Sequence, residues 1–475
     1  MGTTRCTQEA HDEAVSDAAP ISTVSVEHTL PGVRTPSLAL SIAIASGTAL
    51  VLGLVRLGAA SLWFDEGYTA DAAHRSPKWW FDNDQYHVLY DGLMRLWTSV
   101  LGESEWVLRL PSVVGAVVAS ALIVVLARRL FDGWVALLSG LFLATSPFLV
   151  KWSQNARSYT LLLALSLGVM LLLLRALERG TRWAWAIYGL AISALVVGHA
   201  VAGLLVVPAH VVLIIQRRER SLPHGLLAAV IAAVVAVPWA ATIAMRSSGA
   251  GVGMNWLKAP SPSTVVSAVL DVSGVAGLGL LFAVGGLLVL TRLDRRDLAL
   301  WLGVWAFAPF VLALLPSAFR PIFLDRFLIL AAPAFALLAA VAVVGVGRRL
   351  GAVALVAAVA ATAVGLAGWY EMADRGNWRG EDWRSAVATV LDRRGESDAI
   401  VVAPWAAAPV ARYYGAPVRG TSTADSIWVL TWSETGREIT REDRRSLGFG
   451  KHVLIERIAF GRRVSAQLWR RPGAS

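Results

Sequence analysis

The chain has 475 residues, of which 56% are hydrophobic and only 16% are charged. A soluble chain of this length carries about a quarter charged residues, so the composition excludes an ordinary soluble protein and predicts a lipid environment. The net charge of +10 is distributed over small arginine clusters between apolar blocks, which excludes a nucleic-acid-binding face. Cys6 is the single cysteine, which excludes a disulfide framework within the chain.

The chain begins with a polar segment, residues 1–36, which predicts a disordered cytoplasmic tail. Apolar blocks long enough to cross about 30 Å of hydrocarbon follow it through residue 369. We predict a polytopic α-helical membrane protein of about eleven transmembrane helices. These cover residues 38–57, 113–126, 134–150, 159–174, 183–197, 201–215, 225–245, 264–290, 298–315, 327–346 and 353–369.

Arginines cluster after every second apolar block, as in Arg128 and Arg129 after the second and Arg348 and Arg349 after the tenth. Cytoplasmic loops are enriched in arginine and lysine, so these loops are predicted to lie inside the cell. The amino terminus is then cytoplasmic, and residues 61–112 form the first extracytoplasmic loop. The predicted location is a bacterial plasma membrane.

Residues 370–475 are predicted to form a small extracytoplasmic α/β domain. Residues 381–394 have helical periodicity, with Trp383, Ala386, Val387 and Val390 on one face. Apolar runs at 399–403, 427–431, 453–456 and 464–469 predict strands, and 407–414 and 440–446 predict further helices. Helix and strand alternate, which favours a layered α/β domain.

Two adjacent carboxylates, Asp65 and Glu66, directly follow the first apolar block. Like charges so close, partly removed from water, raise the pKa of one of them, which suits a general base. Alternatively, both carboxylates simply stabilise a helix amino terminus. Farther along the loop, Asp84 and His87 are three residues apart and would share a face on a helix. With Asp65 or Glu66 they would be the ligands of a divalent cation if one binds.

Cations lie in other segments on the same predicted side of the membrane. Lys151, Gln154, Arg157 and Tyr159 form a polar cluster between two apolar blocks, and Arg320 and Arg326 precede another block. An arginine binds phosphate oxygens as a rigid fork, so two facing one cavity suit a phosphate or pyrophosphate. Interfacial arginine also extends to lipid headgroups. A lone histidine at a turn, such as His199, is more often structural than catalytic.

The ordered set of motifs resembles the GT-C glycosyltransferases, in particular the bacterial branch related to protein O-mannosyltransferases and lipid A aminoarabinose transferases. The resemblance rests on Trp63-x-Asp65-Glu66, His87-x-x-Tyr90, Arg109-Leu110-Pro111-Ser112 and Gln154-x-Ala156-Arg157-x-Tyr159. It covers the first ~180 residues well, Arg326-Phe327 moderately and Glu381-Asp382-Trp383 loosely.

The resemblance implies transfer of a sugar, with mannose favoured, from a polyprenyl-phosphate donor to a glycolipid, polysaccharide or protein acceptor, with inversion. It implies Asp65 as general base with Glu66 supporting it, and Arg157 and Arg326 at the donor phosphate. Lys151 and Arg320, on the same predicted side, are expected to contribute to binding that phosphate. Side chains expected to line the site are Asp84, His87, Tyr90, Gln154, Tyr159 and His199. No cofactor is expected to be required.

Two other classes remain open from the residues. A lipid or sugar transporter would place ionisable residues deep within the spans and show internal repeats, neither of which the sequence displays. A non-catalytic scaffold that binds polyprenyl phosphate would have a lipid cleft without a carboxylate that faces the phosphate.

Overall fold

The computed structural model describes residues 35–84, 86–247, 257–319, 321–372, 377–419, 424–433 and 439–473. The chain divides into two compact units, of which the first comprises residues 1–49, 116–148 and 162–361, and the second comprises residues 50–115, 149–161 and 362–475. The predicted first loop and the predicted carboxyl-terminal domain therefore belong to one unit.

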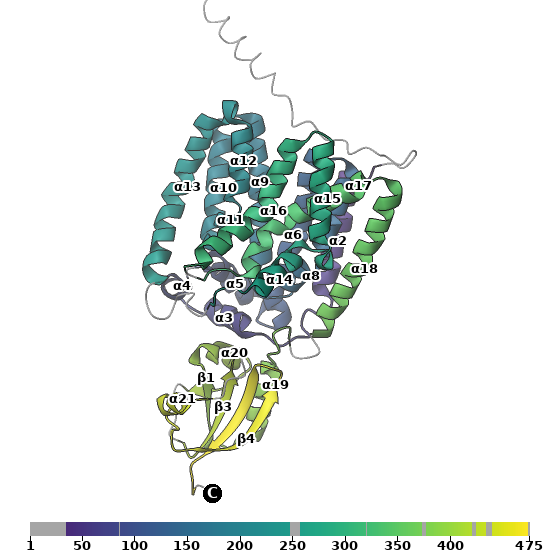
Figure 1. Cartoon of the computed structure of the whole chain (residues 1–475). Coiled ribbons are helices and arrows are strands. Elements are labelled where there is room, and N and C mark those ends of the chain that lie inside the picture. The colour runs from purple at the N-terminus through teal and green to yellow at the C-terminus, as the bar shows by residue number, and fades with distance from the viewer. Residues whose placement is uncertain are drawn as a thin grey trace, which may run out of the picture. The chain divides into compact units, whose positions relative to one another are not determined.

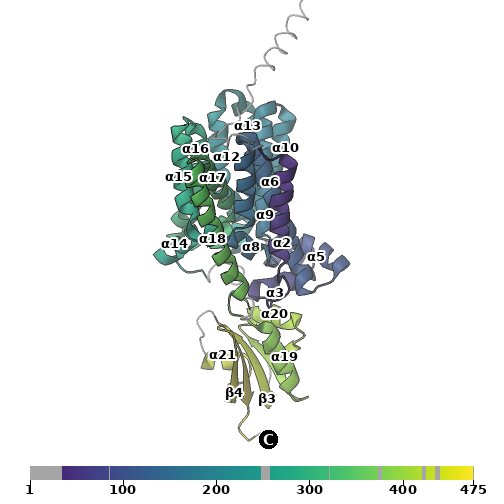
Figure 2. The same ribbon diagram turned by 90° about the vertical axis from the view of Figure 1, so that its right-hand side faces the viewer.

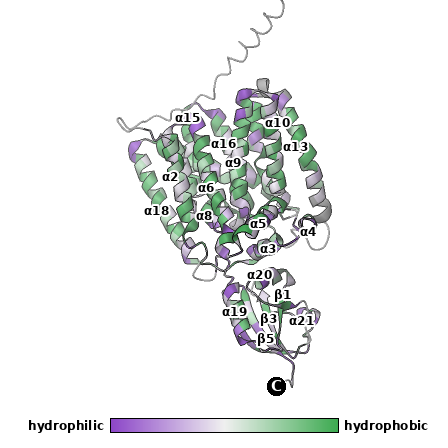
Figure 3. Ribbon diagram, turned by 180° about the vertical axis from the view of Figure 1, so that it is seen from behind, coloured by the Kyte–Doolittle hydropathy of each residue, from purple (hydrophilic) through white to green (hydrophobic). Residues whose placement is uncertain are grey.

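The first unit is helical, and apolar residues dominate its helices (Figures 1 and 3). Helices α10 and α13 pack against each other, as do α15 and α17. The helices that lie wholly or partly in this unit are α2 Leu38–Leu54, α6 Glu105–Leu130, α7 Gly133–Ala144, α8 Pro147–Ser153, α9 Tyr159–Arg179, α10 Arg182–Gly198, α11 Ala200–Leu205, α12 Val207–Gln216, α13 Arg218–Ser247, α14 Pro262–Ser273, η1 Val275–Gly277, α15 Gly279–Arg292, α16 Arg296–Ser317, η2 Asp325–Ala331, α17 Ala332–Gly345 and α18 Arg348–Met372.

Within the described residues, five helices are long and apolar enough to cross a membrane, and the bent pair α7 and α8 makes a sixth. Five shorter apolar helices accompany them. This is the pattern of a multi-pass membrane protein, while the count of eleven crossings and their orientation stay predictions. The expectation of one continuous span over 264–290 is wrong, because α14 ends at Ser273 and Gly274 and Gly277 have φ angles of 74° and 92°, which a right-handed helix cannot contain.

The second unit combines the first loop with a five-stranded mixed sheet of order β2-β1-β3-β5-β4. Strand β1 runs parallel to β2 and β3, while β5 is antiparallel to β3 and β4. Its elements, apart from the ends of helices shared with the first unit, are α3 Phe64–Ala73, α4 Pro77–Asn83, α5 Val88–Leu101, α19 Trp383–Arg393, β1 Ala399–Ala403, η4 Trp405–Ala407, α20 Ala408–Tyr413, β2 Val418–Arg419, β3 Ser426–Trp432, α21 Arg441–Ser446, β4 Val453–Phe460 and β5 Val464–Arg470.

The predicted carboxyl-terminal elements are confirmed. Helix α19 buries Trp383, Ala386, Val387 and Val390, the four residues that the periodicity places on one face. Successive side chains of β1 enter two different apolar clusters. Ile400 packs in the cluster that contains the α19 residues, and Val401 packs in the cluster that contains Phe449. Figure 2 shows α19 beside the sheet.

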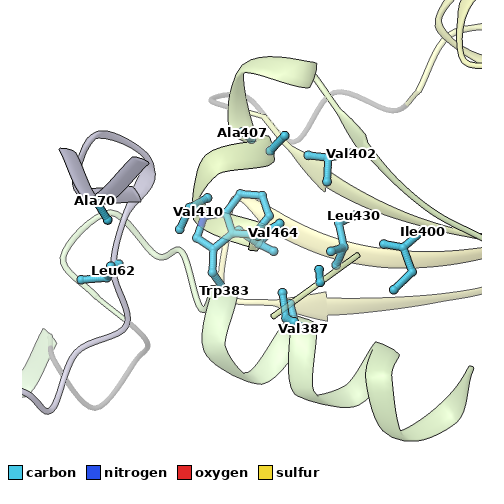
Figure 4. Close-up of a cluster of buried hydrophobic side chains, with 14 of the residues drawn as sticks. Leu62, Ala70, Trp383, Val387, Ile400, Val402, Ala407, Val410, Leu430 and Val464 are labelled. Atoms are coloured by element: carbon cyan, nitrogen blue, oxygen red, sulfur yellow. The ribbon is translucent and has the colours of Figure 1, made fainter. Parts of the chain in front are cut away.

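One apolar cluster joins the loop to the sheet domain (Figure 4). Leu62 and Ala70 from the loop share it with Trp383, Val410 and Leu430 from the domain. Helix α3 approaches α20 so closely that a β-carbon at Gly67 would overlap the side chain and backbone of Val410. Burial of this shared surface therefore fixes α3 against the domain, and α3 is the helix that carries Asp65 and Glu66.

Candidate functional site

The site is built around the amino terminus of α3, where the two adjacent carboxylates point to different surroundings. Consecutive helix positions are about 100° apart, so Asp65 and Glu66 cannot face the same way. Asp65 is partly exposed, whereas Glu66 is fully buried. Of the two, only Asp65 can meet a molecule that arrives from solution or from lipid.

Glu66 forms a buried ion pair with Arg109 of α6. Its Oε1 lies 2.8 Å from Arg109 Nε and its Oε2 lies 2.8 Å from Arg109 Nη2. Glu66 also accepts hydrogen bonds from the backbone amides of Ala156 at 2.7 Å and Trp63 at 3.3 Å. Arg109 in turn donates to the carbonyls of Leu57, Ala60 and Ser61. The Glu66–Arg109 pair therefore connects α3, α6 and the segment around Ala156, and Glu66 stabilises the conformation of the loop.

Arg157 lies on the Asp65 side of α3 and is 6% exposed. Its Nη1 donates to the carbonyl of Asp65 at 3.3 Å and to Thr69 Oγ1 at 3.1 Å. Its Nη2 lies 2.9 Å from His87 Nε2. Within the described residues, the buried Nε–H of Arg157 has no hydrogen-bond partner. The guanidinium is therefore fixed from one side and keeps a donor for an additional acceptor.

His87 connects Arg157 to Asp84. Its Nδ1 lies 2.7 Å from Asp84 Oδ1, and because an arginine can only donate, His87 Nε2 must accept and Nδ1 must carry the proton. Burial and the neighbouring Arg157 lower the pKa of His87 against the opposing effect of Asp84, so the ring is neutral. Burial raises the pKa of Asp84, but His87 and Arg157 outweigh it and the net pKa is lowered.

The predicted cation ligands are not grouped for metal binding in the described part of the chain. Among the residues that the structure describes, no group of three or more His, Cys, Asp or Glu side chains is arranged to hold a metal ion, and Asp65, Asp84 and His87 are no exception. The physical reason is that both ring nitrogens of His87 are already engaged, one by Asp84 and one by Arg157.

Other residues predicted for the site have partners that account for their positions. Gln154 donates to the carbonyls of Leu52, Gly53 and Val55 at the end of α2 and accepts from Trp369. The Lys151 ammonium lies 4.0 Å from the centre of the Trp378 ring. Tyr159 is buried edge-on against Trp152 at 4.8 Å, and Tyr90 is buried in the shared apolar cluster.

The remaining predicted residues belong to the first compact unit or lie outside the described residues. His199 and Arg326 belong to the first compact unit, where the His199 ring packs edge-on against Phe327 at 4.6 Å. Both side chains are buried. Arg320 lies outside the described residues.

The sequence assigned no role to three residues that shape the site, Arg109, Asp91 and Glu381. Arg109 was recognisable in principle, because a charge on an apolar helix requires a partner. Asp91, on α5, is 1% exposed, and its Oδ2 has no hydrogen-bond partner within the described chain. Burial, reinforced by Asp84, raises the pKa of Asp91 to about 8, so this carboxyl group is protonated at neutral pH. No local pattern marks Asp91, and Glu381 stands out only in the loose resemblance of residues 381–383.

Comparison with known proteins places this geometry in context. The family model described as dolichyl-phosphate-mannose-protein mannosyltransferase matches residues 88–241. No curated protein sequence matches the chain.

Solved structures share the fold, among them the following three. ArnT from Cupriavidus metallidurans bound to undecaprenyl phosphate is 15% identical, with a TM-score of 0.60 over 90% of this chain and 97% of that one. The Archaeoglobus fulgidus oligosaccharyltransferase tethered to an acceptor peptide is 12% identical, with a TM-score of 0.55 over 80% and 63%. Arabinofuranosyltransferase AftD from Mycobacteria is 13% identical, with a TM-score of 0.54 over 93% and 40%.

Proposed function

On the premise that this chain resembles the GT-C glycosyltransferases and has their fold, we propose that it is an integral membrane glycosyltransferase. It moves a sugar, with mannose favoured, from a polyprenyl-phosphate donor to an extracytoplasmic acceptor with inversion. The observation that carries the proposal is the pairing of an accessible carboxylate, Asp65, with a fixed guanidinium, Arg157, that donates to the Asp65 carbonyl.

Arg157 is proposed to bind the donor phosphate. Its unpaired Nε–H is the kind of donor that a phosphate oxygen satisfies. Neutral His87, held by Asp84, orients the guanidinium without adding a competing charge. Support from the comparisons is that ArnT, whose fold this chain shares, was solved with undecaprenyl phosphate.

Asp65 is proposed as the general base, with Glu66 in a supporting role through the Arg109 pair. Asp65 accepts the proton of an acceptor hydroxyl while that oxygen attacks the anomeric carbon of the sugar. The bond from that carbon to the phosphate oxygen breaks, and its electron pair leaves with the polyprenyl phosphate. The product phosphate gains one negative charge, which Arg157 stabilises most as the charge develops.

The rest of the site is proposed from the sequence and the resemblance. Arg326, Arg320 and Lys151 are further candidates for the donor phosphate, and His199, Tyr90, Gln154 and Tyr159 for the lining. The reaction is proposed to need no cofactor and to take place on the outer side of a bacterial plasma membrane. The acceptor is a glycolipid, polysaccharide or protein.

The decisive experiment is transfer from radiolabelled polyprenyl-phosphate mannose to membrane acceptors by purified protein. Asp65→Asn should abolish transfer, and Arg157→Gln should weaken donor binding. Asp71→Asn is the matched control, because Asp71 is on the same helix but pairs with Arg75, and it should retain activity. Transfer that survives EDTA would support a metal-independent reaction.

Substantial transfer by Asp65→Asn would overturn the assignment of the base. If a panel of sugar donors yields no transfer by the wild type while polyprenyl phosphate still binds, the scaffold interpretation gains. If labelled lipid instead crosses reconstituted vesicles, the transporter interpretation gains.

A further inference from the structure

Glu381 is a buried carboxylate of the sheet domain that reaches the helix carrying Asp65. It is 0% exposed, and its Oε2 accepts a hydrogen bond from the backbone amide of Phe64 at 2.9 Å. Phe64 is the first residue of α3, and Asp65 is the second. A side chain 317 residues away in sequence therefore binds the amino-terminal amide of this helix.

The first amides of a helix have no acceptor within the helix and need one from elsewhere. In α3, Glu66 accepts from the amide of Trp63, and Glu381 accepts from the amide of Phe64. A carboxylate at a helix amino terminus also interacts favourably with the helix dipole. Two buried carboxylates thus fix the first turn, and one of them comes from the carboxyl-terminal domain.

Glu381 is itself held firmly. Asn377 Oδ1 accepts from the amide of Glu381 at 3.0 Å, and Asn377 Nδ2 donates to the carbonyl of Glu381 at 2.8 Å. Trp383 Nε1 donates to Glu381 Oε2 at 3.3 Å, and Arg379 Nε lies 3.5 Å from Glu381 Oε1. The carboxylate therefore presents a fixed oxygen to α3.

Neighbouring contacts hold the same loop from other sides. Arg384 donates to the carbonyls of Gly58, Ala59 and Ala60 and pairs with Glu105. The Tyr414 hydroxyl accepts from the amide of Leu62 at 2.7 Å. The domain thus binds residues 58–62 before the Glu381 contact and Glu105 after it. Helix α3 therefore has little freedom to move independently of the domain.

We propose that Glu381 is a positioning residue, which sets the position of Asp65 by binding the Phe64 amide. The effect on transfer rests on the proposed function of Asp65, whereas the effect on helix α3 does not. The sheet domain then serves to build the catalytic end of the loop, whatever acceptor it also contacts.

The first test measures hydrogen exchange at the start of α3 in the full-length protein. In Glu381→Ala, amides of residues 64–67 should exchange about ten- to hundredfold faster, the range for loss of a hydrogen bond to a charged group. Exchange in β1 and β3 should stay unchanged. Glu456→Ala is the matched control, because Glu456 pairs with Arg393 on the surface of the same domain, and α3 should exchange as in wild type.

Two further variants of Glu381 distinguish the effect of side-chain length from the effect of charge. Glu381→Gln loses the charge but retains an oxygen at the same reach, so exchange at α3 should rise much less than in Glu381→Ala. Glu381→Asp keeps the charge beside Arg379 but is one methylene shorter, so exchange should rise as in Glu381→Ala. The reverse pattern, with Asp tolerated and Gln not, would assign Glu381 to its ion pair with Arg379 and overturn the proposal. Unchanged exchange in all three variants would also overturn it.

The second test measures transfer. Glu381→Ala and Glu381→Asp should lower kcat roughly ten- to hundredfold, as expected for a misplaced catalytic group, with little change in KM for the donor. Glu381→Gln should restore most of kcat. If exchange changes as expected but no protein in the series, wild type included, transfers sugar, the proposed function fails and the positioning role stands. If wild type transfers sugar and the Glu381 variants exchange faster at α3 but keep the kcat of wild type, the positioning role is wrong while the proposed function stands.

Discussion

At the scale of single residues, the adjacent carboxylates Asp65 and Glu66 have opposite physical situations. Glu66 is fully buried and fully hydrogen-bonded, while Asp65 remains accessible. Burial thus gives Glu66 a structural role and leaves Asp65 able to contact a substrate. The consequences of removing each charge should differ accordingly.

Glu66→Gln should destabilise the protein by roughly 3–5 kcal/mol, because it leaves Arg109 charged and buried without its partner. Asp65→Asn should melt close to wild type. The measurement is the apparent Tm of each purified variant in detergent. A Glu66→Gln protein as stable as wild type would show that the pair contributes little to the loop.

Asp91 should make stability dependent on pH. Its folded pKa of about 8 lies above that of an ordinary aspartate, so the unfolded state loses its proton first as pH rises. Stability should therefore fall as pH rises from about 4 to about 8, by up to ~1.4 kcal/mol per pH unit, and level off above.

Asp91→Asn removes this ionisation, so its advantage in apparent Tm over wild type should grow across that window. Melting both proteins at several pH values measures it. Asp392→Asn, an exposed aspartate on α19, is the control and should show no growing advantage. A constant difference between Asp91→Asn and wild type would mean that Asp91 titrates normally.

At the scale of elements, the contact between α3 and α20 depends on a glycine. A methyl group at Gly67 would overlap Val410, including its backbone, so the helices would have to separate. Gly67→Ala should therefore cost about 1–3 kcal/mol of stability and reduce transfer. Gly168→Ala in α9, where no atom lies within 4 Å of the added carbon, should be neutral or stabilising. Apparent Tm compares the two, and equal behaviour would contradict the close approach.

Local sequence patterns were sufficient to predict the helices and strands of the sheet domain. Strand β1 follows from a short continuous apolar run and helix α19 from helical spacing, both of which neighbouring residues alone determine. The break after α14 was missed because an apolar composition continues through it, and only two glycines signal it.

At the scale of the whole molecule, the predicted orientation places the carboxyl-terminal domain outside the cell. In a Cys6→Ala background, Ser397→Cys should react with a membrane-impermeant maleimide in intact cells, because Ser397 is exposed in that domain. Thr291→Cys, beside the predicted cytoplasmic Arg292, should react only after permeabilisation. Labelling in the opposite pattern would reverse the orientation and place the proposed site in the cytoplasm.

The sequence by itself determined what depends on composition and short-range periodicity. Apolar blocks predicted membrane helices because hydrocarbon excludes charge, and the motifs around Asp65 and Arg157 predicted a carboxylate and an arginine in the same region. The predicted shared helix face of Asp84 and His87 is wrong, because Asp84 ends α4 and His87 precedes α5. The turn between the two helices brings His87 Nδ1 to 2.7 Å from Asp84 Oδ1.

The tertiary structure decided which of these groups face solvent and which partners hold them. Glu66 can be buried because it pairs with Arg109, which is 43 residues away in the sequence. The amide of Phe64 is bound by Glu381, which is 317 residues away. No local pattern encodes such pairings, since they depend on how distant segments pack. The exposure of Asp65, the fixed side of Arg157 and the raised pKa of Asp91 all follow from that packing.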